Sequence, residues 1–96
     1  MTKSSRDELL LETTKALRAA SQAALEGAPV LESWMVDRGF GVRTLVGFVH
    51  HSPNFPDGRF IRTSEVRRFV PELGFARTMN RYYRLGLSFE EWRKSQ

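Results

Sequence analysis

The chain has 96 residues, of which 41% are hydrophobic and 27% charged, a composition that fits one globular domain over residues 1–96. Its lack of cysteine excludes disulfides, thiolate catalysis and cysteine-ligated metal centres. The first residues contain no apolar signal-peptide region, and no apolar run approaches the length of a membrane span, so a cytoplasmic protein is expected.

The net charge of +4 is unevenly distributed along the chain. Residues 1–38 carry five basic against six acidic side chains, whereas residues 39–96 carry ten basic against five acidic ones. Arginines outnumber lysines by twelve to three, and arginine is the residue suited to bidentate contact with phosphate or carboxylate. The charge therefore favours an anionic partner for the second half, either nucleic acid or an acidic protein surface.

Residues 5–26 have the pattern of an amphipathic helix. Ser5 and Glu8 have the spacing of a capping box, and leucines and alanines then recur at helical intervals. Gly27 suits the left-handed position after a helix, and Pro29 prevents its continuation. Because the second half of the apolar stripe is rich in alanine, we expect the helix to pack closely on the rest of the domain, with a partner-binding helix as the alternative.

The segment from residue 30 to 41 is expected to be an irregular link, whereas residues 42–86 are typical of an antiparallel sheet. Short stretches rich in β-branched and aromatic residues alternate there with turn signals: "VRTLVGFV", "RFIRTSEV", "VRRFV" and "FARTMNRYYRL". "PELG" predicts a tight connection between two strands. The last stretch is expected to be a single strand with imperfect alternation, because its apolar residues share one parity with Arg77 and Arg81. A bulge near Asn80, or arginine stems that cover the apolar face, would account for this.

The stretch "HHSPNFPDGRFIRTS", residues 50–64, is predicted to be a β-turn-β corner. Its two prolines stiffen the loop, and Asp57 with Gly58 provides the reversal. Thr63 and Ser64 are expected to fix the next turn through hydrogen bonds from their side chains to the backbone. The corner is interpreted first as scaffold, and a stiff loop of this kind also presents side chains for contact.

A short helix is predicted at residues 88–95, because Ser88 and Glu91 repeat the capping-box spacing and Leu87 and Trp92 have that of a hydrophobic staple. We expect this helix to fold back on the sheet. The predicted fold is therefore α+β: an N-terminal helix packed on a small, bent antiparallel sheet of three to four strands, or a partial barrel, with a short C-terminal helix.

Catalytic and metal-binding hypotheses receive little support. His50 and His51 are the only histidines, and neighbours on a strand point to opposite faces, so the pair cannot chelate one ion. A hydrolytic triad could be formed only from Ser52 or Ser64 with a histidine and Asp57, and the sequence around these serines lacks the nucleophile elbow of a hydrolase. We therefore expect no enzymatic activity, cofactor or metal, and no small-molecule substrate.

The strongest functional pattern is cationic. From residue 59 to residue 84, seven arginines are interleaved with aromatic residues and accompanied by only two acids. Arginine neutralises phosphate and aromatic rings stack on bases, so this pattern favours nucleic-acid contact. The predicted contact residues are Arg59, Arg62, Arg67, Arg68, Arg77, Arg81, Arg84 and Tyr82, with His50, His51 and Asn54 as loop contacts. An unpaired sheet edge is also compatible with a homodimer.

Three stretches together, "PVLESW", "HSPNFPDGRFIRTSEV" and "FARTMNRYYRLG", carry a resemblance to known proteins. The chain resembles a family of short, functionally uncharacterised bacterial proteins, alphaproteobacterial and associated with mobile elements. Their pattern is His-Pro-x-x-Pro-Asp-Gly-x-x-Ile-x-Thr-Ser followed by Arg-Thr-x-x-Arg-x-Tyr-x-Leu-Gly, and the match covers about residues 29–86. Here Ser52 separates His51 from Pro53. The resemblance implies a fold and a genomic setting rather than an activity.

Two functional hypotheses follow. The first is a small non-enzymatic binding module that contacts nucleic acid through an arginine-aromatic sheet surface, with a regulatory role. It predicts affinity that falls steeply with salt. The second is a protein inhibitor or adaptor of phage or mobile-element origin, such as an anti-CRISPR-type blocker of a host defence complex. Exposed arginines suit this role because they complement an acidic protein surface.

Overall fold

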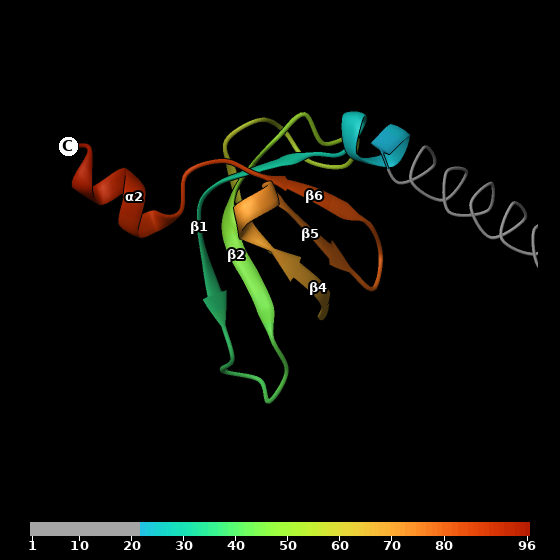
Figure 1. The fold of residues 1–96 in the computed structure, drawn as a ribbon, viewed down its shortest axis with the longest axis horizontal. Helices are drawn as coiled ribbons and strands as arrows, with labels where there is room; N and C mark the ends of the chain where they lie inside the picture. Colours follow the sequence, from blue (N-terminus) through green and yellow to red (C-terminus); the bar gives the residue numbers. More distant parts are fainter. Residues whose placement is uncertain (1–21) are drawn as a thin grey trace, which may run out of the picture.

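The computed structural model describes residues 22–96, which form a six-stranded mixed sheet with a short helical segment at each end (Figure 1). Residues 22–26 are helical and precede the first strand. The elements that follow are β1 (Val30–Asp37), β2 (Thr44–His50), β3 (Arg59–Arg62), β4 (Val66–Val70), the 3-10 turn η1 (Pro71–Leu73), β5 (Phe75–Thr78), β6 (Tyr82–Leu85) and α2 (Phe89–Lys94).

The strand order is β3-β2-β1-β6-β5-β4, in which β1 and β6 are parallel and the other neighbours are antiparallel. The two outermost strands, β3 and β4, follow each other in the chain with only three residues between them. The Thr63 N–H donates to the Leu45 carbonyl and the Val66 N–H to the Arg43 carbonyl. The chain therefore stays beside β2 as it bends from β3 into β4, and the sheet curls strongly.

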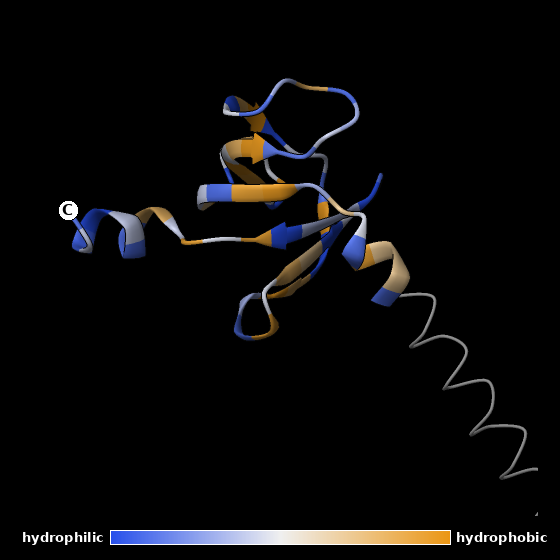
Figure 2. Ribbon diagram, turned by 90° about the horizontal axis from the view of Figure 1, so that it is seen from above, coloured by the Kyte–Doolittle hydropathy of each residue, from blue (hydrophilic) through white to orange (hydrophobic). Residues whose placement is uncertain are grey.

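The core lies inside this curl. Alternate residues of β2 point inward, and the neighbouring strands contribute aliphatic and aromatic side chains. The buried cluster consists of Leu31, Leu45, Val49, Ile61, Val66, Ala76 and Tyr83. Trp34 and Phe69 pack against this cluster and meet each other edge to face, with ring centroids 5.5 Å apart. Figure 2 shows hydrophobic colouring along the strands, as expected if the strands supply the core.

The predicted fold of a helix on a three-to-four-stranded sheet is wrong, because the sheet has six strands and includes residues 30–37. The predicted helix over residues 5–26 is described only at residues 22–26; these are helical and exposed except for half-buried Leu25, and the remainder lies outside the described residues. The strand at residues 30–37 was missed because it carries a bulge: Ser33 has a φ of 50°, and Ser33 and Trp34 together face Gly47. The bulge interrupts the alternation that marks a strand.

Two predicted single strands are each divided. "FARTMNRYYRL" forms β5 and β6 joined by a turn, in which the Thr78 hydroxyl accepts hydrogen bonds from the Asn80 and Arg81 N–H groups. The turn explains the imperfect alternation, since Ala76 and Thr78 point inward before it and Tyr83 after it. "RFIRTSEV" likewise breaks after β3.

The capping box predicted for the C-terminal helix is confirmed. The Ser88 hydroxyl accepts from the Glu91 N–H, and the Ser88 N–H donates to the Glu91 carboxylate. Only the start of the helix lies against the sheet, however: a bridge between Trp34 and Ser88 places it beside β1, and the rest of α2 extends outward without a buried residue (Figure 1). In the described part of the chain, helices are too short or too polar to cross a membrane.

Candidate nucleic-acid interface

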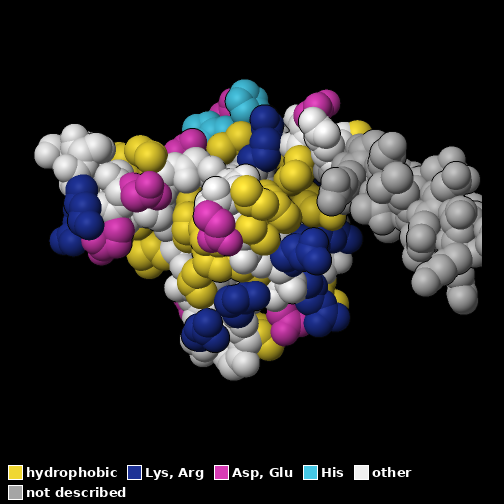
Figure 3. Space-filling view, in the orientation of Figure 1, with side chains coloured by type: hydrophobic (Ala, Val, Ile, Leu, Met, Phe, Trp, Pro, Cys, Tyr) yellow, Lys and Arg dark blue, Asp and Glu magenta, His cyan; other side chains and the backbone are white. Residues whose placement is uncertain are grey.

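Arginine and aromatic side chains gather on the outer face of β4, β5 and β6. Register places Arg68 opposite Arg77 and Arg77 opposite Tyr82, so the three form one row across the strands. The next row contains Val70, Phe75 and Arg84. We call these six residues, with Arg81 at their border, the β4–β6 face. Figure 3 shows Lys and Arg side chains gathered over the part of the molecule where β4 and β5 lie.

The centre of the β4–β6 face is a stack of arginine on tyrosine. The guanidinium carbon of Arg77 lies 5.0 Å from the ring centroid of Tyr82, within the range of a cation–π contact. On the neighbouring position, the Phe75 ring lies 6.2 Å from the Tyr82 ring. The contact uses the face of the ring, so the N–H groups of the guanidinium remain available to other acceptors.

Two further arginines are positioned by the backbone around this stack. The Arg84 Nε donates to the Ala28 carbonyl at 2.9 Å, which fixes the side chain and leaves its terminal nitrogens for other partners. Arg81 closes the β5–β6 turn, where the Arg81 carbonyl accepts from the Thr78 N–H and hydroxyl. Within residues 22–96, no carboxylate lies at ion-pair distance from Arg68, Arg77, Arg81 or Arg84. Their positive charge is therefore not neutralised by neighbours in this part of the chain.

Two open hollows flank the face. One has a volume of about 410 Å³ and brings Arg77, Arg81 and Tyr82 together with Pro53 and Pro29. The other, of about 420 Å³, is lined in part by Phe75, Arg84 and Leu85. These hollows give an extended ligand more than a flat surface to contact, because charged and aromatic groups border both of them.

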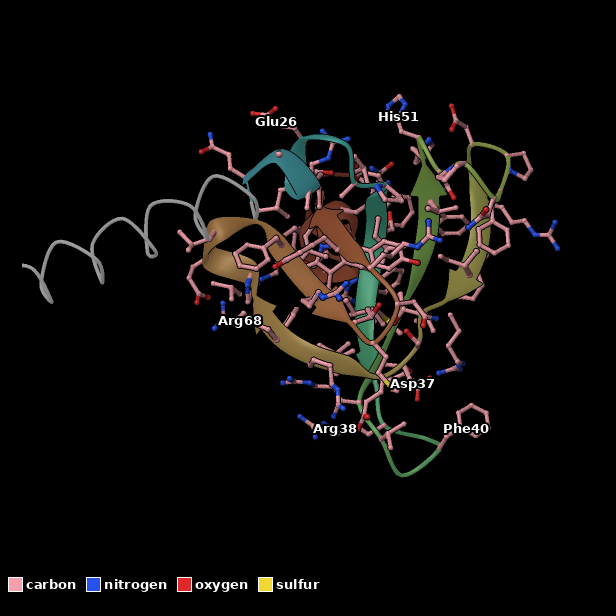
Figure 4. The ribbon with its side chains drawn as sticks, turned by 90° about the vertical axis from the view of Figure 1, so that its right-hand side faces the viewer. Glu26, Asp37, Arg38, Phe40, His51 and Arg68 are labelled. Atoms are coloured by element: carbon pink, nitrogen blue, oxygen red, sulfur yellow. The ribbon has the colours of Figure 1, made fainter. Side chains whose placement is uncertain are left out.

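The arginines of β3 lie elsewhere and already have partners. Arg62 forms an ion pair with Asp37 at 3.0 Å, donates to the Thr44 hydroxyl and lies 4.8 Å from the Phe40 ring centroid. The hydrogen bond from the Gly39 N–H lowers the pKa of Asp37 most, and the hydrogen bond from Arg62 lowers it further. Both contacts favour the charged carboxylate. Arg59 covers the Phe55 ring at 5.7 Å. In Figure 4 Arg68 is on the left and Phe40 on the right.

Arg67 and the predicted loop contacts lie outside the β4–β6 face. His50 is the last residue of β2 and pairs with Val30 of β1. Arg67 is the bulged residue of β4 and lies 3.6 Å from the Glu65 carboxylate. In the corner, which is confirmed as β2–loop–β3, the Asp57 carboxylate accepts from the His51 N–H and the Ser52 hydroxyl accepts from the Asn54 N–H. The His51 side chain points away from the sheet in Figure 4.

The structure thus brings together five of the predicted residues, Arg68, Arg77, Arg81, Arg84 and Tyr82, and separates them from Arg59 and Arg62. Phe75 and Pro53 were missed by sequence reasoning. The outward direction of Phe75 becomes visible only once the β5–β6 turn is known, and Pro53 reaches the hollow through the fold of its loop. Among the described residues, no group of three or more His, Asp or Glu side chains is arranged to hold a metal ion.

Comparison with known proteins assigns the chain to a family. No curated protein and no solved structure matches it. The family of unknown function DUF6634 matches residues 2–94, which is nearly the whole sequence and includes every element described above. The chain therefore belongs to the DUF6634 family.

Proposed function

We propose that this protein is a non-enzymatic binding module that contacts nucleic acid through the β4–β6 face. The observation that carries the proposal is the row of Arg68, Arg77 and Tyr82, with a guanidinium stacked on the ring and no carboxylate at ion-pair distance among the described residues. Planar guanidinium groups bind phosphate oxygens in pairs, and aromatic or guanidinium planes stack on bases.

Single-stranded nucleic acid fits this face better than a duplex. The bases of a single strand are free to turn onto the Arg77–Tyr82 stack, whereas the bases of a duplex are stacked on one another. The surrounding arginines then contact phosphates without reading the sequence. Binding is therefore proposed to tolerate many sequences and to weaken as salt rises.

The family resemblance suggests the setting in which such a module acts. The chain resembles short alphaproteobacterial proteins associated with mobile elements, and we propose a regulatory role for nucleic-acid binding in that setting. An acidic protein surface offers the same charge as a phosphate backbone. A phage or mobile-element inhibitor or adaptor, such as an anti-CRISPR-type protein, is therefore the alternative if no nucleic acid binds.

Charge-matched variants test the proposal. Fluorescence anisotropy with a labelled single strand and the corresponding duplex compares wild type, Arg68→Ala/Arg77→Ala/Arg81→Ala, and the control Arg38→Ala/Arg59→Ala/Lys94→Ala. Both variants lose three positive charges from exposed or half-buried positions. The face variant is expected to lose roughly tenfold or more in affinity, and the control less than about threefold, because local phosphate contacts matter more than net charge.

The single strand is also expected to bind more tightly than the duplex, and Tyr82→Leu is expected to reduce that preference because the base loses its stacking partner. Equal losses in the two triple variants would show that binding follows net charge rather than this face. Absence of binding to either probe at low salt would reject nucleic acid as the partner.

A further inference from the structure

The edge of β3 is a second surface with binding potential. β3 is the outermost strand next to β2, and it lies at the right-hand rim in Figure 4. The Thr63 N–H donates to the Leu45 carbonyl at 2.8 Å, so alternation along the antiparallel pair turns the backbone groups of Ile61 toward β2. The N–H and C=O groups of Phe60 and Arg62 consequently face outward, where no further strand lies among the described residues.

An apolar groove adjoins this edge on the outer face of β1, β2 and β3. Its volume is about 370 Å³, and it is lined by Ser33, Met35, Val46, Phe48, Phe60 and Phe89. The Phe48 and Phe60 rings meet edge to face at 5.2 Å and remain 42% and 58% exposed. Phe89 reaches the groove from the first turn of α2. The side chains of three strands and a helix thus converge on one apolar site.

The exposed area of this groove is large for a small domain. Three phenylalanines and Met35 each leave more than a third of their surface in contact with water. Together they expose on the order of 350 Å² of apolar surface, which is the range of the largest patches on monomeric proteins and is often functional. An unpaired strand edge beside an apolar site is the arrangement that accepts an added strand: main-chain groups bind the segment, and the groove selects its side chains.

The charges on β3 indicate which segment would fit. The strand has the sequence "RFIR", with an arginine at each end and no acid. Within residues 22–96, Arg59 has no carboxylate at ion-pair distance, and Arg62 forms an ion pair with Asp37 alone. Edge-to-edge pairing of two copies would gather four guanidinium groups in one short ribbon, and such like charges disfavour pairing. A segment with carboxylates has the complementary charge.

We propose that β3 binds an extended, acidic segment of another protein as an added strand. The Phe60 and Arg62 backbone groups pair with the segment, and an apolar side chain at alternate positions enters the groove beside Phe48 and Phe60. The glutamate or aspartate side chains at the other positions lie on the opposite face of the strand, where they meet Arg59. This surface is formed by β1, β2, β3 and α2, so it is separate from the β4–β6 face. The proposal for β3 therefore does not depend on nucleic-acid binding by the β4–β6 face.

A labelled peptide of about eight residues in which leucine alternates with glutamate is the probe, and the same peptide with lysine in place of glutamate is its control. Phe60→Pro removes the ring and the outward N–H, and an edge position whose N–H faces solvent tolerates proline. Phe60→Ala removes the ring alone. Leu73→Ala is the matched control, because Leu73 is an apolar residue that is 74% exposed and lies outside the groove.

Fluorescence anisotropy is expected to show saturable binding of the glutamate peptide to wild type and to Leu73→Ala. Affinity is expected to fall roughly tenfold or more for Phe60→Pro and several-fold for Phe60→Ala, since each removes a defined part of the contact. Amide hydrogen exchange at Phe60 and Arg62 is expected to slow when the peptide binds, while exchange at Ile61, which already faces β2, changes less.

Three outcomes would overturn the proposal: no saturable binding of the glutamate peptide, equal binding of the lysine peptide, or unchanged exchange at Phe60 and Arg62 in the bound state. Sedimentation of the protein without peptide tests the remaining possibility, which is that this edge pairs with a second copy of the chain. A wild-type dimer that Phe60→Pro converts to a folded monomer would assign this edge to a second copy of the chain. Circular dichroism and urea unfolding check that both Phe60 variants are folded.

Discussion

At the scale of single residues, Gly47 illustrates how closely β1 and β2 approach. It lies on β2 opposite the bulge at Ser33 and Trp34. A Cβ at this position would lie 2.9 Å from the Glu32 carbonyl oxygen and 3.1 Å from the Trp34 Cα. Both are backbone atoms, which cannot move aside as the end of a flexible side chain does. The bulge therefore depends on a residue without a side chain.

Gly47→Ala is expected to destabilise the protein by about 1–3 kcal/mol, because the added methyl group forces the two strands apart. Urea unfolding followed by tryptophan fluorescence measures the change. Gly27→Ala is the control: a Cβ there would meet no atom within 4 Å, and stability is expected to change by less than about 0.5 kcal/mol. Equal effects at the two positions would contradict the packing described here.

Asp37 gives a prediction in the acidic pH range. Its pKa is lowered in the folded state by the Gly39 N–H and by Arg62, so the charged carboxylate supports folding. That support is complete above the ordinary aspartate pKa of about 4 and is lost as the pH falls through the lowered folded value.

The stability difference between wild type and Asp37→Asn is therefore expected to be largest near neutral pH and to shrink as the pH falls below about 4. Urea midpoints measured across the acidic range test this. A difference that stays constant down to about pH 2 would show that the carboxylate charge is not responsible. The Asp37–Arg62 pair was not predictable from sequence, because its partners are 25 positions apart and meet through the β1–β2–β3 register.

At the scale of elements, α2 is held by its own cap more than by the core. None of its residues is buried, and the Ser88–Glu91 capping box satisfies two of the free N–H groups at its start. Ser88→Ala is expected to weaken the helix by about 1 kcal/mol and to leave the unfolding of the sheet unchanged.

Amide hydrogen exchange separates these two effects. In Ser88→Ala, exchange is expected to accelerate at Trp92 and Ser95, whose N–H groups donate within the helix, and to stay unchanged at Val49 in the core. Ser88→Thr, which keeps a hydroxyl at the cap, is expected to behave nearly as wild type. Faster exchange throughout the sheet would mean that α2 stabilises the whole domain.

The elements also show which parts of the fold a sequence can predict. The cap at Ser88 and the corner at residues 50–64 depend on contacts between residues close in the chain, and both were predicted. β1 was missed because its bulge breaks the alternation and its pairing with β6 joins positions more than fifty residues apart. The β5–β6 turn has no glycine or proline, so the sequence lacks the usual signal for it.

At the scale of the whole molecule, the arginines divide between two surfaces. The composition of residues 59–84 indicated an anionic partner, yet it suggested one surface because the bend between β3 and β4 is not visible in the sequence. That bend leaves Arg59 and Arg62 on β3 and places Arg68, Arg77, Arg81 and Arg84 around the β4–β6 face. The two surfaces can therefore be altered separately by substitution.

The most direct test of nucleic-acid binding by the β4–β6 face is the salt dependence of single-strand affinity for wild type and Arg68→Ala/Arg77→Ala/Arg81→Ala. Each phosphate contact contributes about 0.7 to the slope of log affinity against log salt concentration, so the slope of the variant is expected to be shallower by about 2. The control Arg38→Ala/Arg59→Ala/Lys94→Ala is expected to keep the wild-type slope. Identical slopes for wild type and the face variant would contradict the account.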